Sequence, residues 1–217
     1  LCASVFFFLR TADGRRSLRM ILGITGAFGC GKSSVLAVFS ARGWRTADAD
    51  RLCHELYAGG SELAADLVKR WGAGILLPSG EVDRRKLASI VFEDQAELDA
   101  LTALLYPRLA GRLDLFIAEC RRDGTDAAIE IPLLYEAGLD EKFDAVAAVW
   151  SAPEIRRERL RRKRNFSEEE IRRRESRQLA ADLKLERADY GLINNGPPEE
   201  LARQINLLID QLHCHNI

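Results

Sequence analysis

The sequence predicts an α/β fold in which a parallel sheet of five strands carries helices on both faces. Short, almost continuously apolar segments alternate with longer segments of helical periodicity, which is typical of strands buried beneath crossover helices. A glycine-rich loop stands between the first strand and the first helix, at 26–31. A stretch of 77 residues, 49–125, separates the second strand from the third, far more than one crossover needs, so we expect an inserted helical region there.

The strand candidates are 20–25, 44–48, 126–131, 143–149 and 190–193. The helix candidates are 32–42, 49–58, 61–71, 83–91, 94–123, 153–164, 167–187 and 198–212. We expect Pro107 to begin or kink the helix that runs to about 122, because proline has no backbone N–H to donate. These elements predict a single domain over 20–217, with a core of 20–48, 126–152 and 188–217, a helical region 49–125 and a lid region 153–187.

The composition is that of one globular domain, with 47% hydrophobic and 30% charged residues over 217 positions. No run approaches the roughly 20 apolar residues that span a bilayer, so we predict no membrane association. A net charge of -1 argues against a protein that coats nucleic acid, and we predict no nucleic-acid partner. Five widely spaced cysteines predict neither a disulfide framework nor a zinc site, and they favour a reducing, cytoplasmic setting.

Residues 1–19 are expected to be a mis-called start or a disordered extension. The only methionine, Met20, stands directly before the apolar segment 21–25, which favours translation from that position. The alternative is a targeting segment built on the apolar run 5–9. That run is shorter than the usual signal-peptide core of about 7–15 residues, and no basic residue precedes it.

The segment Gly26–Ser33 fits the pattern G-x-x-x-x-G-K-[ST], which cradles nucleotide phosphates. Its glycines let backbone N–H groups point at phosphate oxygens, and the helix N-terminus that follows adds donors and a favourable dipole. Lys32 is expected to reach the β- and γ-phosphates, and Ser33 to offer its hydroxyl to Mg²⁺. The alternative, a chance glycine-rich turn, is disfavoured by the strand before it and the helix after it. The predicted nucleotide-binding residues of this loop are Gly26, Ala27, Phe28, Gly29, Cys30, Gly31, Lys32, Ser33 and Ser34.

This motif in a short chain indicates a fold of the P-loop NTPase type. A GTPase should also carry an Asn-Lys-x-Asp guanine motif, which the sequence lacks. A motor or AAA-type ATPase is usually longer. A compact chain with an inserted helical region therefore favours a small-molecule kinase that uses ATP.

Acidic residues follow the second predicted strand, at Asp48 and Asp50. Ligands bind at the carboxyl ends of parallel strands, and a kinase needs a group that orients the acceptor hydroxyl and accepts its proton. Either carboxylate is a candidate, and the alternative for each is to cap the helix that follows. His54 lies four residues after Asp50 and so on the same helix face, either as a substrate contact or as a packed structural histidine.

The segment 156–164 carries seven basic residues in nine. One interpretation is a lid whose arginines close over the transferring phosphates. A helix cannot aim seven side chains at one ligand, so most are expected to be solvated, with two or three of Arg156, Arg159, Lys163 and Arg164 facing inward. Nucleic-acid binding is a third interpretation.

Further blocks occur in order along 20–212. They are Gly23 to Ser34; Asp48-Ala49-Asp50 with His54; Gly80, Arg84, Leu87 and Val91-Phe92; Pro132-Leu133-Leu134-Tyr135-Glu136; and Arg159-Leu160, Arg174, Gln178, Ala188-Asp189 and Asn195-Gly196. Together they resemble the dephospho-coenzyme A kinase family. The resemblance implies a five-stranded parallel core, a helical substrate-binding region and a lid. It also implies transfer of the γ-phosphate of ATP to the ribose 3′-hydroxyl of dephospho-CoA, the last step of coenzyme A synthesis.

The resemblance assigns roles to individual residues. Lys32, Asp50 and Arg159 are the predicted catalytic residues, and Asn195 and Gly196 are expected beside adenine. The predicted substrate-binding residues are Thr25, Asp48, Asp50, His54, Arg84, Tyr106, Pro132, Leu133, Leu134 and Glu136. Glu130 is either a second-shell Mg²⁺ group or a buried, paired structural acid. We expect Trp44 and Trp71 to pack rather than stack on a nucleotide.

The sequence departs from the family at two of these positions. Tyr106 stands where the family usually has histidine, and Lys163 stands where the lid often has arginine. Lysine keeps the charge but loses the bidentate fork. The rival functions are another P-loop kinase of a nucleoside or sugar, and a non-catalytic nucleotide-regulated RNA-binding protein. We expect a monomer or weak homo-oligomer.

Overall fold

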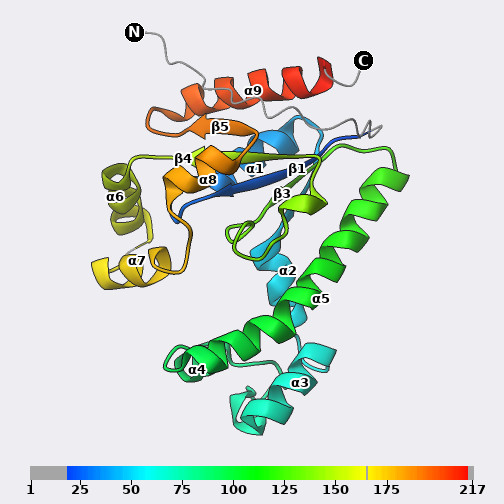
Figure 1. Ribbon diagram of the computed structural model, residues 1–217, viewed down its shortest axis with the longest axis vertical. Coiled ribbons are helices and arrows are strands. Elements are labelled where there is room, and N and C mark those ends of the chain that lie inside the picture. The colour runs from blue at the N-terminus through cyan, green and yellow to red at the C-terminus, as the bar shows by residue number, and fades with distance from the viewer. Residues whose placement is uncertain (1–18, 165, 215–217) are drawn as a thin grey trace. The chain divides into compact units, whose positions relative to one another are not determined.

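The computed structural model describes residues 19–164 and 166–214 (Figure 1). All but the last residue of the segment 1–19, for which a mis-called start is predicted, therefore lies outside the described ranges. The chain forms two compact units. One comprises the residues up to Asp48 together with those from Ile117 onward, and it contains the sheet. The other, Ala49–Phe116, is helical.

Five parallel strands form one sheet in the order β2-β3-β1-β4-β5, which confirms the predicted fold class. The strands are β1 (Ile21–Gly26), β2 (Arg45–Asp48), β3 (Ala127–Glu130), β4 (Ala145–Trp150) and β5 (Tyr190–Ile193). Their register aligns Ile24 of β1 with Glu130 on one side and Ala147 on the other. All the strands run the same way, so the loops that follow them gather at one edge.

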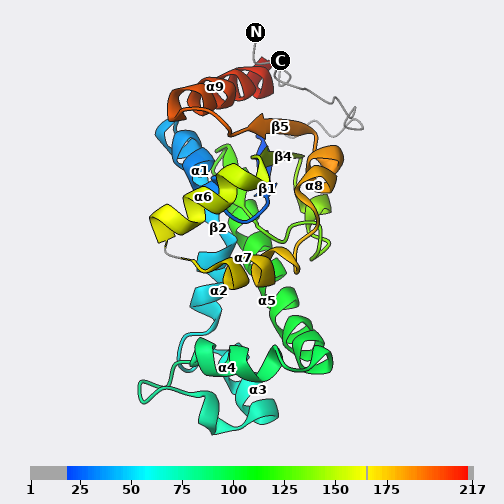
Figure 2. The ribbon, with the colours of Figure 1, turned by 90° about the vertical axis from the view of Figure 1, so that its left-hand side faces the viewer.

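Helices cover both faces of the sheet. In this unit they are α1 (Lys32–Ala41), the end of α5, α6 (Pro153–Arg164), α7 (Glu168–Glu175), α8 (Ala181–Arg187) and α9 (Pro198–Cys214). Helices α1 and α9 pack against each other on one face, while α8 packs on β4 and β1 from the other (Figures 1 and 2).

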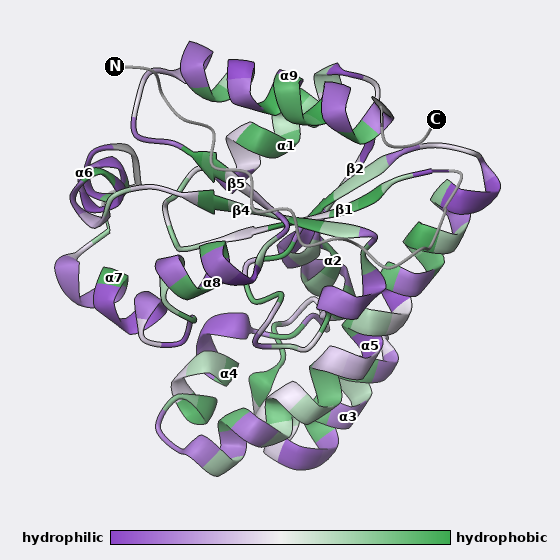
Figure 3. Ribbon diagram, turned by 45° about the horizontal axis from the view of Figure 1, so that its top comes forward, coloured by the Kyte–Doolittle hydropathy of each residue, from purple (hydrophilic) through white to green (hydrophobic). Residues whose placement is uncertain are grey.

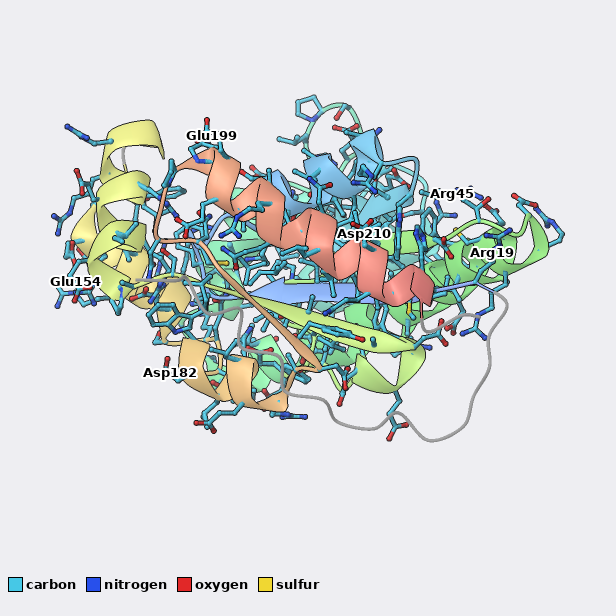
Figure 4. All side chains as sticks on the ribbon, turned by 90° about the horizontal axis from the view of Figure 1, so that it is seen from above. Arg19, Arg45, Glu154, Asp182, Glu199 and Asp210 are labelled. Carbon is cyan, nitrogen blue, oxygen red and sulfur yellow. The ribbon has the colours of Figure 1, made fainter. Side chains whose placement is uncertain are left out.

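The apolar face of α9 completes the main core. Its buried residues recur at helical spacing, namely Leu201, Ile205, Leu208, Ile209 and Leu212. The hydropathy of α9 alternates along its ribbon accordingly (Figure 3). Seen from above, the helix lies across the sheet, with Glu199 near its beginning and Asp210 towards its end (Figure 4). Among the described residues, no helix combines the length and apolar character needed to cross a membrane.

The predicted single helix 167–187 is two helices, α7 and α8, and that prediction is wrong. Ser167 starts α7 with a capping box in which Glu170 completes the second bond. The connection 176–180 is not helical because its polar groups bond elsewhere. Gln178 accepts a hydrogen bond from the N–H of Phe28 through Oε1, and the N–H of Leu179 donates to Glu136.

The helical unit has its own core. It contains α2 (Ala49–Leu56), α3 (Glu62–Trp71), a 3₁₀ turn (Ala73–Ile75), α4 (Arg84–Val91) and the larger part of α5 (Gln95–Arg122). Leu63, Leu67, Ile75, Leu87 and Val91 form the buried cluster, and leucines of α5 pack against it.

Helix α5 continues through Pro107, so Pro107 does not begin the helix, and the alternative that it kinks the helix stays a prediction. An internal proline costs about 3 kcal/mol because one backbone bond is lost. Leu98, Leu101, Leu104 and Leu105 precede it and pack on the core of the helical unit. Their burial offsets the cost of continuing the helix.

Three aspartates accept hydrogen bonds from backbone N–H groups at the amino-terminal edge of the sheet, the edge opposite the loops that follow the strands. Asp126 accepts the N–H of Met20, Asp144 that of Ile21 and Asp189 that of Val146, each with a distance of 2.8 Å between nitrogen and oxygen. Each carboxylate precedes one strand and bonds the backbone of a neighbour. These bonds therefore pin adjacent strands where the ladder begins.

We predict that Asp144→Ala lowers the free energy of unfolding by about 1–3 kcal/mol, because it leaves the N–H of Ile21 without its charged acceptor. The matched control is Asp210→Ala, which removes an exposed ion pair with Arg42 and should cost at most about 1 kcal/mol. Urea unfolding measures both variants. Equal losses would contradict the role of the strand-edge bond.

Candidate functional site

The glycine-rich loop joins the end of β1 to the start of α1. Gly26, Gly29 and Gly31 have positive φ angles of 148°, 80° and 97°. A Cβ on Gly26 would lie 2.3 Å from the carbonyl oxygen of Val149, and one on Gly31 would lie 2.3 Å from Asn194 Nδ2. These positions therefore require glycine for both conformation and space.

Lys32 lies across this loop. Its Nζ donates to the carbonyl oxygens of Gly26 at 3.1 Å and Ala27 at 3.2 Å, and the side chain is buried. Ser33 and Ser34 are exposed in the first turn of α1. A cation, two hydroxyls and the N-terminal amides of α1 thus stand together, an arrangement suited to phosphate oxygens.

Phe28 connects the loop to the lid region. Its N–H donates to Gln178 Oε1 and its carbonyl oxygen accepts from Arg156 Nη1, each at 3.0 Å. Arg156 is 6% exposed and pairs with Glu175 at 2.6 Å. Arg156 of α6 and Gln178, which follows α7, therefore hold the two peptide groups on either side of Phe28, and helices α6 and α7 contact each other (Figure 2).

Arg174 lies beside the same residue. Its guanidinium carbon is 5.1 Å from the ring centre of Phe28 and 4.9 Å from that of Phe166, and the two rings meet edge to face. Cation–π contacts of this kind hold a charge without neutralising it. An exposed cation thus stands next to the phosphate-binding loop. Arg174 and Gln178 appeared in the family pattern but were not predicted as site residues.

Asn194, a residue that sequence reasoning missed, holds the loop from the side of β5. Its Nδ2 donates to the carbonyl oxygen of Cys30 at 2.8 Å, and it is 8% exposed. Arg159 Nη1 donates to the carbonyl oxygen of Asn194 at 2.9 Å. The predicted neighbour Asn195 instead accepts the N–H of Ala152 at 2.9 Å. No local sequence signal distinguished Asn194 from its neighbour, and the roles of Asn195 and Gly196 beside adenine stay predictions.

The remaining arginines of α6 mostly form surface ion pairs, as expected for a solvated basic segment. Arg157 and Arg161 pair with Glu168, and Arg162 pairs with Glu158. The side chains of Lys163 and Arg164 lie outside the described residues.

A pocket of about 300 Å³ adjoins the phosphate-binding loop. Its lining includes Ala27, Arg156 and Gln178. The rest of its lining comes from Trp150, Ser151, Pro153, Glu175, Leu179, Ala180, Ala181 and Asp182. The pocket therefore joins the end of β4 to the segment between α7 and α8.

The loop after β3 carries the predicted block Pro132–Glu136. Leu134 is fully buried, and its Cδ1 would lie 2.9 Å from a Cβ on Gly23, so its side chain belongs to the core. Thr25 is also fully buried and donates to the carbonyl oxygen of Pro132 at 3.5 Å. These two residues support the loop from behind, while Pro132 and Leu133 are partly exposed.

Two carboxylates stand at the same edge of the sheet. Asp48 and Glu130 end neighbouring strands and are in register with each other. Glu130 is 6% exposed. Within the described ranges, no three side chains of His, Cys, Asp or Glu gather as a metal site. Oxygen donors from carboxylates and Ser33 nevertheless have the chemistry that Mg²⁺ prefers.

Four predicted residues belong to the helical unit. Asp50 is exposed in the first turn of α2, and His54 is exposed in its last turn. Arg84 begins α4 with its guanidinium over the ring of Tyr57, at 5.5 Å, and Tyr106 is half-buried in α5. Their roles towards a substrate stay predictions.

The two tryptophans pack as expected. Trp44 is 5% exposed, with its ring 4.9 Å from that of Phe39. The indole N–H of Trp71 donates to Glu97 at 2.8 Å in the helical unit.

The chain is similar to known dephospho-CoA kinases. The dephospho-CoA kinase family model matches residues 20–200. The dephospho-CoA kinase of Enterococcus faecalis is 34% identical over 191 residues, which cover 88% of this chain and 96% of the relative. The crystal structure of TT1252 from Thermus thermophilus has a TM-score of 0.75 and 32% identity, covering 89% of this chain and 98% of that one. Dephospho-CoA kinase from Campylobacter jejuni shares the fold, with a TM-score of 0.71 and 22% identity over 91% and 98% of the two chains.

We predict that Gly31→Ala weakens ATP binding at least tenfold, equivalent to about 1.4 kcal/mol, measured by titration with a fluorescent ATP analogue. The new Cβ forces the amide of Asn194 away from the carbonyl of Cys30. The control is Gly43→Ala, where φ is 84° and no atom lies within 4 Å of the added Cβ. Gly43→Ala should lower the free energy of unfolding by about 1–2 kcal/mol, because alanine is strained at a left-handed φ, and it should leave the ATP affinity unchanged. Equal ATP affinities would show that the Asn194 contact is irrelevant to binding.

Proposed function

The chain belongs to the dephospho-CoA kinase family, and on that premise we propose how its residues transfer the γ-phosphate of ATP to the ribose 3′-hydroxyl of dephospho-CoA. The observation that carries the activity is the family match over 20–200, which includes the whole phosphate-binding loop. The 3′-oxygen attacks the γ-phosphorus while the bond from that phosphorus to the bridging oxygen of ADP breaks. The hydroxyl proton leaves, and the products are coenzyme A and ADP.

The phosphates of ATP occupy the loop 26–34. The N–H groups at the start of α1 face their oxygens, and Lys32 exchanges its bonds to Gly26 and Ala27 for bonds to the β- and γ-phosphates. Ser33 would hold Mg²⁺, Glu130 at the end of β3 would support the ion through its ligands, and the ion would supply positive charge to the phosphate oxygens. Asp48 is proposed as a substrate contact. Asn195 and Gly196 lie beside adenine in this proposal.

Cations of the lid region stabilise the charge of the transferring group. Arg159 is anchored on Asn194, so its guanidinium is already oriented at the edge of the loop. Arg174 is exposed beside Phe28 and adds a second cation to the site. Preorganised charges of this kind act on the transition state without having to be ordered during the reaction.

The residues that the family pattern assigns to the acceptor have the following proposed roles. Asp50 orients the 3′-hydroxyl and accepts its proton. His54, Arg84 and Tyr106 supply polar contacts to dephospho-CoA, and Tyr106 binds rather than acts as an acid or base. Pro132 and Leu133 form the apolar wall. We also propose a cytoplasmic location and a monomer or weak homo-oligomer.

We predict dephospho-CoA-dependent ADP release by the full chain with Mg-ATP, measured in a coupled assay. Asp50→Asn should lower kcat by about 10²–10⁴-fold, because it removes the proton acceptor while keeping the side-chain shape. Asp210→Asn is the control on the outer part of α9 and should leave kcat unchanged. If folded protein binds ATP but dephospho-CoA does not stimulate its ADP release, the proposed reaction is contradicted. Full activity in Asp50→Asn would keep the reaction and remove Asp50 as its base.

A further inference from the structure

Lys184 of α8 is a buried cation that the proposed reaction does not use. Its side chain is 0% exposed. The ammonium donates to the carbonyl oxygen of Pro132 at 2.5 Å and to Glu136 Oε1 at 2.8 Å. Both acceptors belong to the loop after β3. One buried side chain therefore holds the block Pro132–Glu136 of that loop at its first and last residue.

Burying the positive charge of Lys184 costs free energy because the ammonium loses its contact with water. Burial lowers the pKa of Lys184 below its ordinary value, its bonds to Glu136 oppose that effect, and the nearby charge of Lys32 adds to the lowering. A buried ion pair is weak evidence for stability, because apolar side chains of similar size often do as well or better. Stability alone gives no reason for a charge at this position.

The contacts of Glu136 lead from Lys184 to the phosphate-binding loop. Glu136 Oε1 also accepts the N–H of Leu179 at 2.7 Å. The preceding residue, Gln178, accepts the N–H of Phe28 in the phosphate-binding loop. A continuous path of hydrogen bonds and one peptide link thus joins the loop after β3 to the loop that binds ATP.

We propose that Lys184 is a positioning residue that, through Glu136, fixes the acceptor-binding loop Pro132–Glu136 relative to the phosphate-binding loop. The inference rests on the proposed function, since that function makes Pro132–Glu136 part of the acceptor site. Lys184 itself touches no substrate because it is fully buried. Glu136 accordingly acts by holding the loop, and its Oε1 is already occupied by two donors.

The phosphate-binding loop has other supports. Lys32, Arg156 and Asn194 each donate to one or more of its carbonyl oxygens. Loss of Lys184 should therefore disturb the acceptor more than ATP. The inference thus predicts a larger loss for dephospho-CoA than for ATP. General destabilisation would affect both substrates.

The test uses Lys184→Met in the full chain. We expect kcat/KM for dephospho-CoA to fall about 10- to 100-fold, the effect of a displacement near 1 Å at a reacting group, with KM for ATP close to that of the unaltered protein. Arg42→Met is the control, because it removes an exposed ion pair between α1 and α9. It should change neither constant. An unchanged kcat/KM for dephospho-CoA in Lys184→Met would overturn the inference.

The double variant Lys184→Met with Glu136→Gln separates positioning from stability. It leaves no unpaired buried charge, so its melting temperature should return towards that of the unaltered protein. The loss in kcat/KM for dephospho-CoA should remain. Recovery of both properties would show that the pair acts only on stability and would overturn the inference. Should Lys184→Met fail to fold, the double variant decides by the same criterion.

Amide hydrogen exchange makes the inference testable apart from the reaction. In both variants, amides of 133–139 and 176–180 should exchange faster, while those of α9 keep their protection. Unchanged exchange in both segments would overturn the positioning role. If the unaltered protein does not phosphorylate dephospho-CoA, the proposed function fails, and the exchange result still decides whether Lys184 fixes the two loops.

Discussion

The phosphate-binding loop has no regular secondary structure, so the rest of the structure has to orient its peptide groups. Between β1 and α1 three glycines hold left-handed or otherwise uncommon angles, and within the loop the N–H of Cys30 donates to the carbonyl oxygen of Ala27 while other groups turn outward. Side chains from other segments supply the missing partners. Arg156 and Gln178 hold the peptide groups of Phe28, and Asn194 holds the carbonyl of Cys30. The loop is thus shaped by residues between 120 and 170 positions away in the chain.

The same supports connect binding to the lid region. Arg156 pairs with Glu175, so the bond that holds Phe28 also joins α6 to α7. Arg159 is anchored on Asn194, the residue that packs against Gly31. A shift of the phosphate-binding loop would therefore also move Arg159, which is proposed to act on phosphate. On the acceptor side, Lys184 and Glu136 extend this network to the loop after β3.

The fold was largely predictable because its signals are local and repeated. All five strands were located. Strands β1, β3 and β4 are short runs buried almost throughout, the pattern of parallel strands covered on both faces, whereas β2 is partly exposed. The departures from the predicted helices arise where tertiary contacts altered a local pattern. Gln178 and Leu179 interrupt a helical pattern by bonding to distant segments, and leucines of α5 carry the helix through Pro107.

The sequence by itself determined the strand–loop–helix motif, because glycine spacing and the Lys-Ser pair are constraints within a few residues of one another. It also determined the order of strands and helices along the chain and the family resemblance. Only the tertiary structure decided the partners of the loop. Nothing in the sequence around Asn194 or Lys184 marks them, since an asparagine after a strand and a lysine in a helix are ordinary at the surface. Their importance comes from burial and from contacts more than 40 residues away, which local patterns do not encode.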